Sequence, residues 1–158
     1  MNREFTMKDR FPTVLPNNTL VVFGSNTEGW HGAGLAKTCK EIYGAIQYIG
    51  EGRQGQCYAI PTKERDESKP KPALKIMSLD KIYNHIRTFI QYAQAHPEVT
   101  YLVSPIGCGL AGYSPKQIAP LFASATDIEC IRLPKEFNVI LNEYNKLPYN
   151  DPEATYEF

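Results

Sequence analysis

Short apolar runs alternate with longer amphipathic stretches along this chain. Residues 20–23, 57–60, 100–104 and 128–133 are rich in branched side chains and short enough to form buried strands. A similar run at residues 45–49 also predicts a strand, and the glycine-rich turn GEGRQG separates it from the run that follows. The pattern therefore predicts a sheet built from several short strands.

Between these runs, apolar residues recur at three- and four-residue steps, which is typical of helices with one buried face. One helix is expected after Gly34, with Gly44 as its C-cap, and a second begins at Ser78 as N-cap. The run SPKQ, starting at Ser114, is a strong helix-start signature, and residues 134–146 predict a last helix. The expected apolar positions of the second and last helices are Leu79, Ile82, Tyr83, Ile86, Phe89, Ile90, Ala93, Phe137, Ile140, Leu141 and Tyr144.

Alternating strands and helices predict an α/β protein, specifically a three-layer α/β/α sandwich with a mixed central sheet. The sheet is expected to be mixed because the short link before residue 57 permits only an antiparallel connection. We expect an N-terminal extension over residues 1–19, one domain over 20–146 and a C-terminal tail over 147–158. Residues 64–75 are charged and contain two prolines, which predicts an exposed connection.

Length and charge limit the classes of function. A chain of 158 residues suits one domain with an ordinary core. The 17 basic and 17 acidic residues balance, so no broad positive field exists for a long nucleic acid, although a local patch can hold one nucleotide or a strand end. The sequence has neither a membrane-span run nor the apolar region of a signal peptide at its start, so we expect a cytoplasmic protein without membrane contacts.

The cysteines give no sign of a metal site. Cys39, Cys57, Cys108 and Cys130 are scattered, without a C-x-x-C pair or a Cys/His cluster, so neither a zinc site nor a disulfide framework is expected. We expect no metal and no cofactor. Cys108 differs from the others because it lies between two glycines.

Two glycine-rich segments each follow an expected strand and lead into a helix. The first glycine segment, residues 24–34, reads GSNTEGWHGAG, and the second glycine segment, residues 105–113, reads PIGCGLAGY. Amide N–H groups in such turns form anion-binding nests, and ligands of α/β folds bind beyond the carboxyl ends of the strands, so a pyrophosphate is the expected guest. The alternative, that the glycines only permit tight turns with positive φ, stays open. The run GCGLAG does not predict a dinucleotide fingerprint, because its helix is expected to begin only after the last glycine.

In their order and spacing these segments resemble the macrodomain family. GSN-x(4)-HGAG followed by PIGCGLAGY is similar to the two ligand loops of that family. AIPTKERDESKP, then PIGCGL, then ATDIECIRL resembles the subgroup that removes ADP-ribose from acidic side chains or DNA bases. The resemblance covers residues 20–133 and implies a macrodomain-like fold that binds ADP-ribose or a nucleotide derived from it.

The resemblance also implies roles for single residues. Lys63 matches the lysine that attacks the distal ribose carbon, as an amine nucleophile. The family's aspartate after the G-C-G-L run is replaced by Ala111, so the acid/base half of the reaction lacks its carrier. Glu28, Glu64 and Asp66 are neighbouring acids that would have to substitute, although each is also explained as a solvated charge.

Several side chains of the two segments are candidates for direct ligand contact. Asn26 matches the asparagine that hydrogen-bonds the distal ribose, and Trp30 is the only tryptophan, suited to cover a ligand. His31 has either a ligand or a structural role, and Tyr113 either walls the cleft or packs in the core. The expected ligand-binding residues are Gly24, Ser25, Asn26, Trp30, His31, Gly32, Ala33, Gly34, Ile106, Gly107, Cys108, Gly109, Leu110, Ala111, Gly112 and Tyr113.

Three functions are open at this point. The first is a protein that binds ADP-ribose or a related nucleotide and either sequesters it or reads it on an ADP-ribosylated protein or DNA end. The second is a hydrolase that removes ADP-ribose through Lys63. The third is a partner-binding domain with a degenerate pocket.

Overall fold

The computed structural model describes residues 11–145. The expected tail at 147–158 and the first ten residues of the expected extension lie outside the described residues. No described helix has the length and apolar character that crossing a bilayer requires.

The elements are β1 (Thr19–Asn26), α1 (Gly34–Thr38), a π-helical segment (Cys39–Tyr43), β2 (Gly52–Gln54), β3 (Cys57–Arg65), β4 (Leu74–Ile76), α2 (Leu79–Ala95), β5 (Thr100–Val103), α3 (Pro115–Ile118), a 3₁₀ helix (Ala119–Ala125), β6 (Ile131–Arg132) and α4 (Lys135–Asn145).

The strands form one mixed sheet in the order β2-β3-β1-β5-β6, with β4 also paired to β3. Strand β1 pairs in parallel with β3 on one side and β5 on the other, and β5 pairs in parallel with β6. Strands β2 and β4 run antiparallel to β3. The prediction of an α/β protein with a mixed sheet is confirmed.

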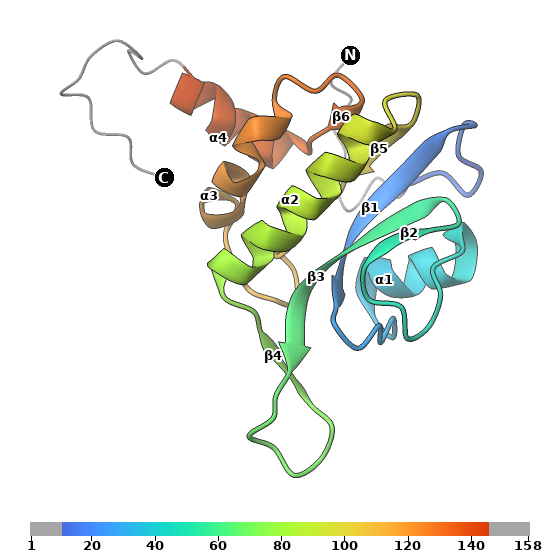
Figure 1. Ribbon diagram of the computed structural model, residues 1–158, viewed down its shortest axis with the longest axis vertical. Coiled ribbons are helices and arrows are strands. Elements are labelled where there is room, and N and C mark those ends of the chain that lie inside the picture. The colour runs from blue at the N-terminus through green and yellow to red at the C-terminus, as the bar shows by residue number, and fades with distance from the viewer. Residues whose placement is uncertain (1–10, 146–158) are drawn as a thin grey trace, which may run out of the picture.

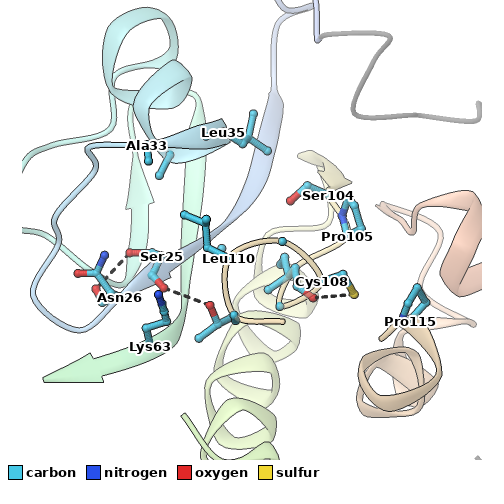
Figure 2. A pocket seen from close by; sticks show the side chains of 18 of the residues that line it. Ser25, Asn26, Ala33, Leu35, Lys63, Ser104, Pro105, Cys108, Leu110 and Pro115 are labelled. Atoms are coloured by element: carbon cyan, nitrogen blue, oxygen red, sulfur yellow. Dashed lines mark hydrogen bonds between the residues drawn. The ribbon is translucent and has the colours of Figure 1, made fainter. Parts of the chain in front are cut away.

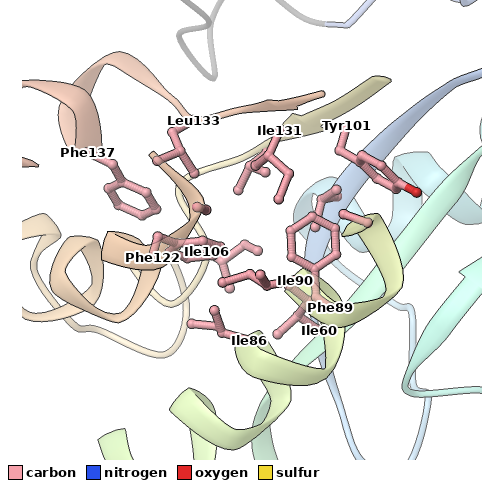
Figure 3. Packing of buried hydrophobic residues seen from close by; sticks show 14 of the residues in the cluster. Ile60, Ile86, Phe89, Ile90, Tyr101, Ile106, Phe122, Ile131, Leu133 and Phe137 are labelled. Atoms are coloured by element: carbon pink, nitrogen blue, oxygen red, sulfur yellow. The ribbon is translucent and has the colours of Figure 1, made fainter. Parts of the chain in front are cut away.

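Side chains of β1 alternate between two apolar clusters, one on each face of the sheet. Leu20 and Val22 belong to the larger cluster, while Val21 and Phe23 belong to the smaller one. The larger cluster joins the sheet to α2, the 3₁₀ helix and α4, and the smaller one joins it to the α1 region (Figure 1). Figure 3 shows the centre of the larger cluster, where Ile60, Ile86, Phe89, Ile90, Tyr101, Ile106, Phe122, Ile131, Leu133 and Phe137 meet.

The long helix begins where the sequence predicts, because the Ser78 side chain accepts a hydrogen bond from the Lys81 amide. Its buried residues are Ile82, Ile86, Phe89, Ile90 and Ala93. Tyr83, expected on the same face, is instead exposed beneath the Arg87 guanidinium, 5.8 Å from the ring centre. The expectation for Tyr83 was wrong because a residue next to Ile82 is turned about 100° away from the buried face.

Residues 45–49 form a turn rather than the expected strand. The Gln54 side chain accepts a hydrogen bond from the Ile46 amide (2.6 Å) and donates one to the Ile49 carbonyl (2.9 Å). Backbone groups that a strand would offer to a neighbour are thus already bound. The edge strand is β2, which lies inside the segment expected to be the turn.

Other boundaries also differ from those expected. Strand β3 continues to Arg65, and β4 pairs back with it, so residues 64–75 lie in a hairpin that extends from the body of the protein (Figure 1). Its tip is exposed, as predicted. Strand β6 covers two residues of the expected 128–133, and only four residues after Ser114 are α-helical before the 3₁₀ helix starts.

The segment before β1 packs against the domain. Leu15 is buried in the smaller apolar cluster, and the Tyr43 hydroxyl donates a hydrogen bond to the Pro12 carbonyl. Strand β1 itself begins at Thr19, within the expected extension. Residues 11–19 are therefore continuous with the domain rather than separate from it.

Candidate functional site

The two glycine segments line one cleft of about 500 Å³ at the carboxyl ends of β1 and β5. This volume lies within the range of about 300–1,000 Å³ typical of small-molecule sites. The predicted site residues that line it are Gly24, Ser25, Asn26, Trp30, Ala33, Gly34, Lys63, Ile106, Gly107, Cys108, Gly109, Leu110 and Ala111. The expectation that both segments face each other across one rim is thus met in the structure.

Four of the predicted ligand-binding residues do not line the cleft: His31, Gly32, Gly112 and Tyr113. The His31 ring is fully buried, packs edge-on against Phe23, and donates from Nε2 to the Ile49 carbonyl at 3.0 Å. The Tyr113 hydroxyl donates to the Met77 carbonyl at 2.7 Å. Both side chains anchor their segments to the body of the protein, which corrects the expectation that they face the ligand.

Asn26 closes the first glycine segment on itself. Its Nδ2 donates to the Trp30 carbonyl at 2.9 Å, and its Oδ1 accepts from the Trp30 amide at 3.0 Å. The side chain of Asn26 is buried, and the residue is 7 % exposed. One amide proton and one lone pair of this side chain remain for a ligand. Asn26 is therefore first a structural clamp, and any ligand contact comes in addition.

Gly29 has a backbone reason to be glycine. It has φ 67°, and a Cβ there would lie 2.3 Å from the carbonyl carbon of Tyr48. The Tyr48 amide donates to the Gly29 carbonyl at 2.8 Å, so the turn at residues 45–49 packs directly on the first glycine segment. The close approach at Gly29 is made by the chain itself and not by a ligand.

Other backbone N–H groups of the two segments are open. Within residues 11–145 no acceptor is found for the amides of Gly32 and Ala33 in the first segment, or of Gly109, Leu110 and Ala111 in the second. A Cβ at Gly109 would meet no atom within 4 Å. Unpaired amides beside a cleft are suited to bind an anion.

Hydrogen bonds at its base hold the second glycine segment in place. Gly107 has φ 76°, and its carbonyl accepts from the Tyr113 amide at 2.9 Å. At the segment's start, the Ser104 hydroxyl donates to the Val22 carbonyl of β1 at 2.7 Å. These bonds leave the tip free, and Leu110 there is 75 % exposed.

Lys63 supplies the only basic side chain among the described residues that line the cleft. It lies on β3 opposite Asn26 of β1, where the register of the two strands shifts. It forms no ion pair with any residue that the structure describes. Figure 2 shows Lys63 and Asn26 at one end of the cleft, with Leu110 and Cys108 between them and Pro115.

The three neighbouring acids that the sequence offered for acid/base work, Glu28, Glu64 and Asp66, do not line the cleft. Each is engaged elsewhere: Glu28 pairs with Arg65 (3.0 Å), Glu64 pairs with Lys81 (2.9 Å), and Asp66 accepts from the Ser68 amide (3.0 Å). The hydrogen bonds from Ser68 lower the pKa of the exposed Asp66 carboxyl. None of these acids is placed for acid/base work at Lys63.

A different acid does reach the cleft. Glu136, in the first turn of α4, lines it, and Ala111, which also lines the cleft, is buried. Burial, and next the charge of Glu136, raise the pKa of the Cys108 thiol to about 11. Cys108 is thus protonated near neutral pH and is no nucleophile there. Among the described residues, no group of three or more His, Cys, Asp or Glu side chains is placed to hold a metal ion.

Sequence reasoning missed the lining residues Leu35, Ala36, Thr62, Ser104, Pro105, Pro115 and Glu136. Six of these seven lie one or two positions from a predicted residue, so extending the predicted ranges by two positions would have found them. Glu136 carried no such signal, because it comes to the cleft through the packing of α4 against α3 and the 3₁₀ helix.

Comparisons with known proteins do not identify a family for this chain. No protein-family model, no curated protein and no solved structure matches the chain.

Proposed function

We propose that the cleft binds ADP-ribose or a related nucleotide derived from it, and that the protein acts as a reader or a sequestering protein in the cytoplasm. One observation carries this proposal: two glycine segments far apart in the sequence line one cleft beside Lys63, and the amides of Ala33, Gly109, Leu110 and Ala111 at this cleft have no acceptor within residues 11–145. Peptide N–H groups at the carboxyl ends of strands suit a diphosphate. Helices on both sides of a mixed sheet agree with the proposed macrodomain-like α/β/α sandwich.

Different lining residues would hold different parts of the ligand. The open amides of the two segments would hold the diphosphate, and Lys63 with the remaining Asn26 proton would face the sugar beyond it. Trp30 is half-buried and lines the cleft, and its ring would contact the ligand. Binding without turnover is favoured over hydrolysis because Ala111 offers no acid or base beside the proposed sugar.

Calorimetry with ADP-ribose, AMP and NAD tests the proposal. We expect ADP-ribose to bind, and to stabilise the protein by about 2.7 kcal/mol at a hundred times its dissociation constant. Lys63→Ala should weaken binding, whereas Lys75→Ala, a matched change on the exposed hairpin, should not. Absence of binding to all three nucleotides at millimolar concentration would instead support the partner-binding domain with a degenerate pocket.

A second function, hydrolysis through Lys63, is favoured by one observation. This amine lines the cleft and forms no ion pair within the described residues, so no described carboxylate holds it away from a ligand, and its unprotonated form would be the nucleophile. ADP-ribosylated protein and ADP-ribosylated DNA would be incubated with the protein, and released ADP-ribose measured. Release that disappears in both Lys63→Ala and Lys63→Arg would establish the hydrolase. No release by the unmodified protein would leave binding as the function.

A further inference from the structure

The cleft has opposite charges at its two ends. Among the described lining residues, Lys63 is the one basic side chain and Glu136 the one acidic side chain. Lys63 belongs to β3, and Glu136 belongs to the first turn of α4. A carboxylate in a cleft suited to anions needs an explanation.

Three observations place Glu136 at the end remote from Lys63. Glu136 and Cys108 both line the cleft, and the charge of Glu136 contributes to the raised pKa of the Cys108 thiol. Figure 2 shows Cys108 and Pro115 on the side of Leu110 away from Lys63. Helix α3, which begins at Pro115, packs against α4. The acidic end therefore lies at the contact of α3 with α4.

Glu136 has no cationic partner among the residues that the structure describes. An acid in the first turn of a helix is favoured by the helix dipole, and this would explain an acid at that turn. It would not explain why this acid is among the residues that line a cleft. A carboxylate there accepts hydrogen bonds from hydroxyl or amino groups and repels a phosphate.

We propose that Glu136 sets the ligand specificity of the cleft by accepting an adenosine end with free ribose hydroxyls and rejecting one that carries a phosphate. This inference rests on the proposed function, in which the diphosphate lies at the open amides and the distal sugar at Lys63. The adenosine end then lies toward α4. Attraction and repulsion act through the same side chain, so a single substitution removes both.

Calorimetry with ADP-ribose and with its 2′-phosphorylated relative tests this role. The unmodified protein should bind ADP-ribose at least about tenfold more tightly, because a phosphate beside an unpaired carboxylate is repelled. Glu136→Gln keeps the side chain's shape and should bring the two affinities within about twofold of each other. Glu143→Gln makes the same change on an exposed residue of α4 that does not line the cleft, and should behave as the unmodified protein.

The possible results separate this inference from the proposed function. If both ligands bind equally to the unmodified protein, or if Glu136→Gln keeps the tenfold preference, Glu136 sets no specificity while the proposed function stands. If neither ligand binds, both ideas are overturned. Thermal melting of the ligand-free variants shows whether each is folded. Glu136→Lys is a second test, because a positive charge there should reverse the preference and favour the phosphorylated ligand.

Discussion

The two glycine segments have similar compositions but are built in different ways. The first is held by its own side chains and by a neighbouring turn. The Asn26 side chain binds the Trp30 backbone, the His31 ring is buried, and the turn at residues 45–49 packs on Gly29. The second has few such ties at its tip, where Leu110 is exposed beside open amides. The first segment is therefore a rigid wall of the cleft, and the second is the side whose backbone is most available to a ligand.

The comparison predicts that glycines in the two segments tolerate substitution differently. Gly29→Ala should lower the free energy of unfolding by more than about 3 kcal/mol, because the new Cβ would collide with Tyr48 backbone at a positive φ. Gly109→Ala, with no atom within 4 Å of the new Cβ, should change it by less than about 0.5 kcal/mol. Urea denaturation measures both, and equal effects would contradict the distinction between a packed and an open segment.

The clamp in the first segment gives the next largest effect. Asn26→Ala should destabilise the protein by about 1–3 kcal/mol, since it removes two hydrogen bonds and leaves the Trp30 amide and carbonyl without partners. Asn84→Ala, on the exposed face of α2, is the matched control and should cost less than about 0.5 kcal/mol. Denaturant unfolding of both variants is the measurement. Similar losses in the two would mean that the clamp contributes nothing to stability.

The contrast also explains what the sequence could predict. Helix starts at Ser78 and Ser114 were predictable because their signals are local. The shared cleft was predictable because strands β1 and β5 are parallel neighbours whose following segments must leave the same edge of the sheet. These are features that a few adjacent residues, or one simple rule of topology, determine.

Features that depend on distant side chains were not predictable. Residues 45–49 look like a strand, and only the Gln54 side chain, which binds Ile46 and Ile49, shows why they form a turn. His31 lies among the expected ligand contacts in the sequence, yet its ring is buried in the core, where the Ile49 carbonyl supplies an acceptor. Composition and spacing do not predict which distant groups become such partners.

A charge at the tip of the second segment should affect binding and not folding. Leu110→Asp places a carboxylate beside the open amides, so the affinity for ADP-ribose should fall about tenfold, or about 1.4 kcal/mol. The melting temperature without ligand should stay unchanged, because Leu110 is exposed. Val139→Asp on the exposed surface of α4 is the control. Unchanged affinity in Leu110→Asp would show that the tip does not contact the nucleotide.

The smallest effect concerns the chemistry of the second segment. With a pKa of about 11, Cys108 should be thiolate in only about one molecule in a thousand at pH 8, so iodoacetamide should react with it slowly there and faster as the pH rises toward 11. Because the Glu136 charge is the second cause of the raised pKa, Glu136→Gln should move this reactivity profile to lower pH. Mass spectrometry with a Cys108→Ser variant assigns the modified thiol. Rapid modification at neutral pH would mean that the second segment presents a reactive sulfur as well as its amides.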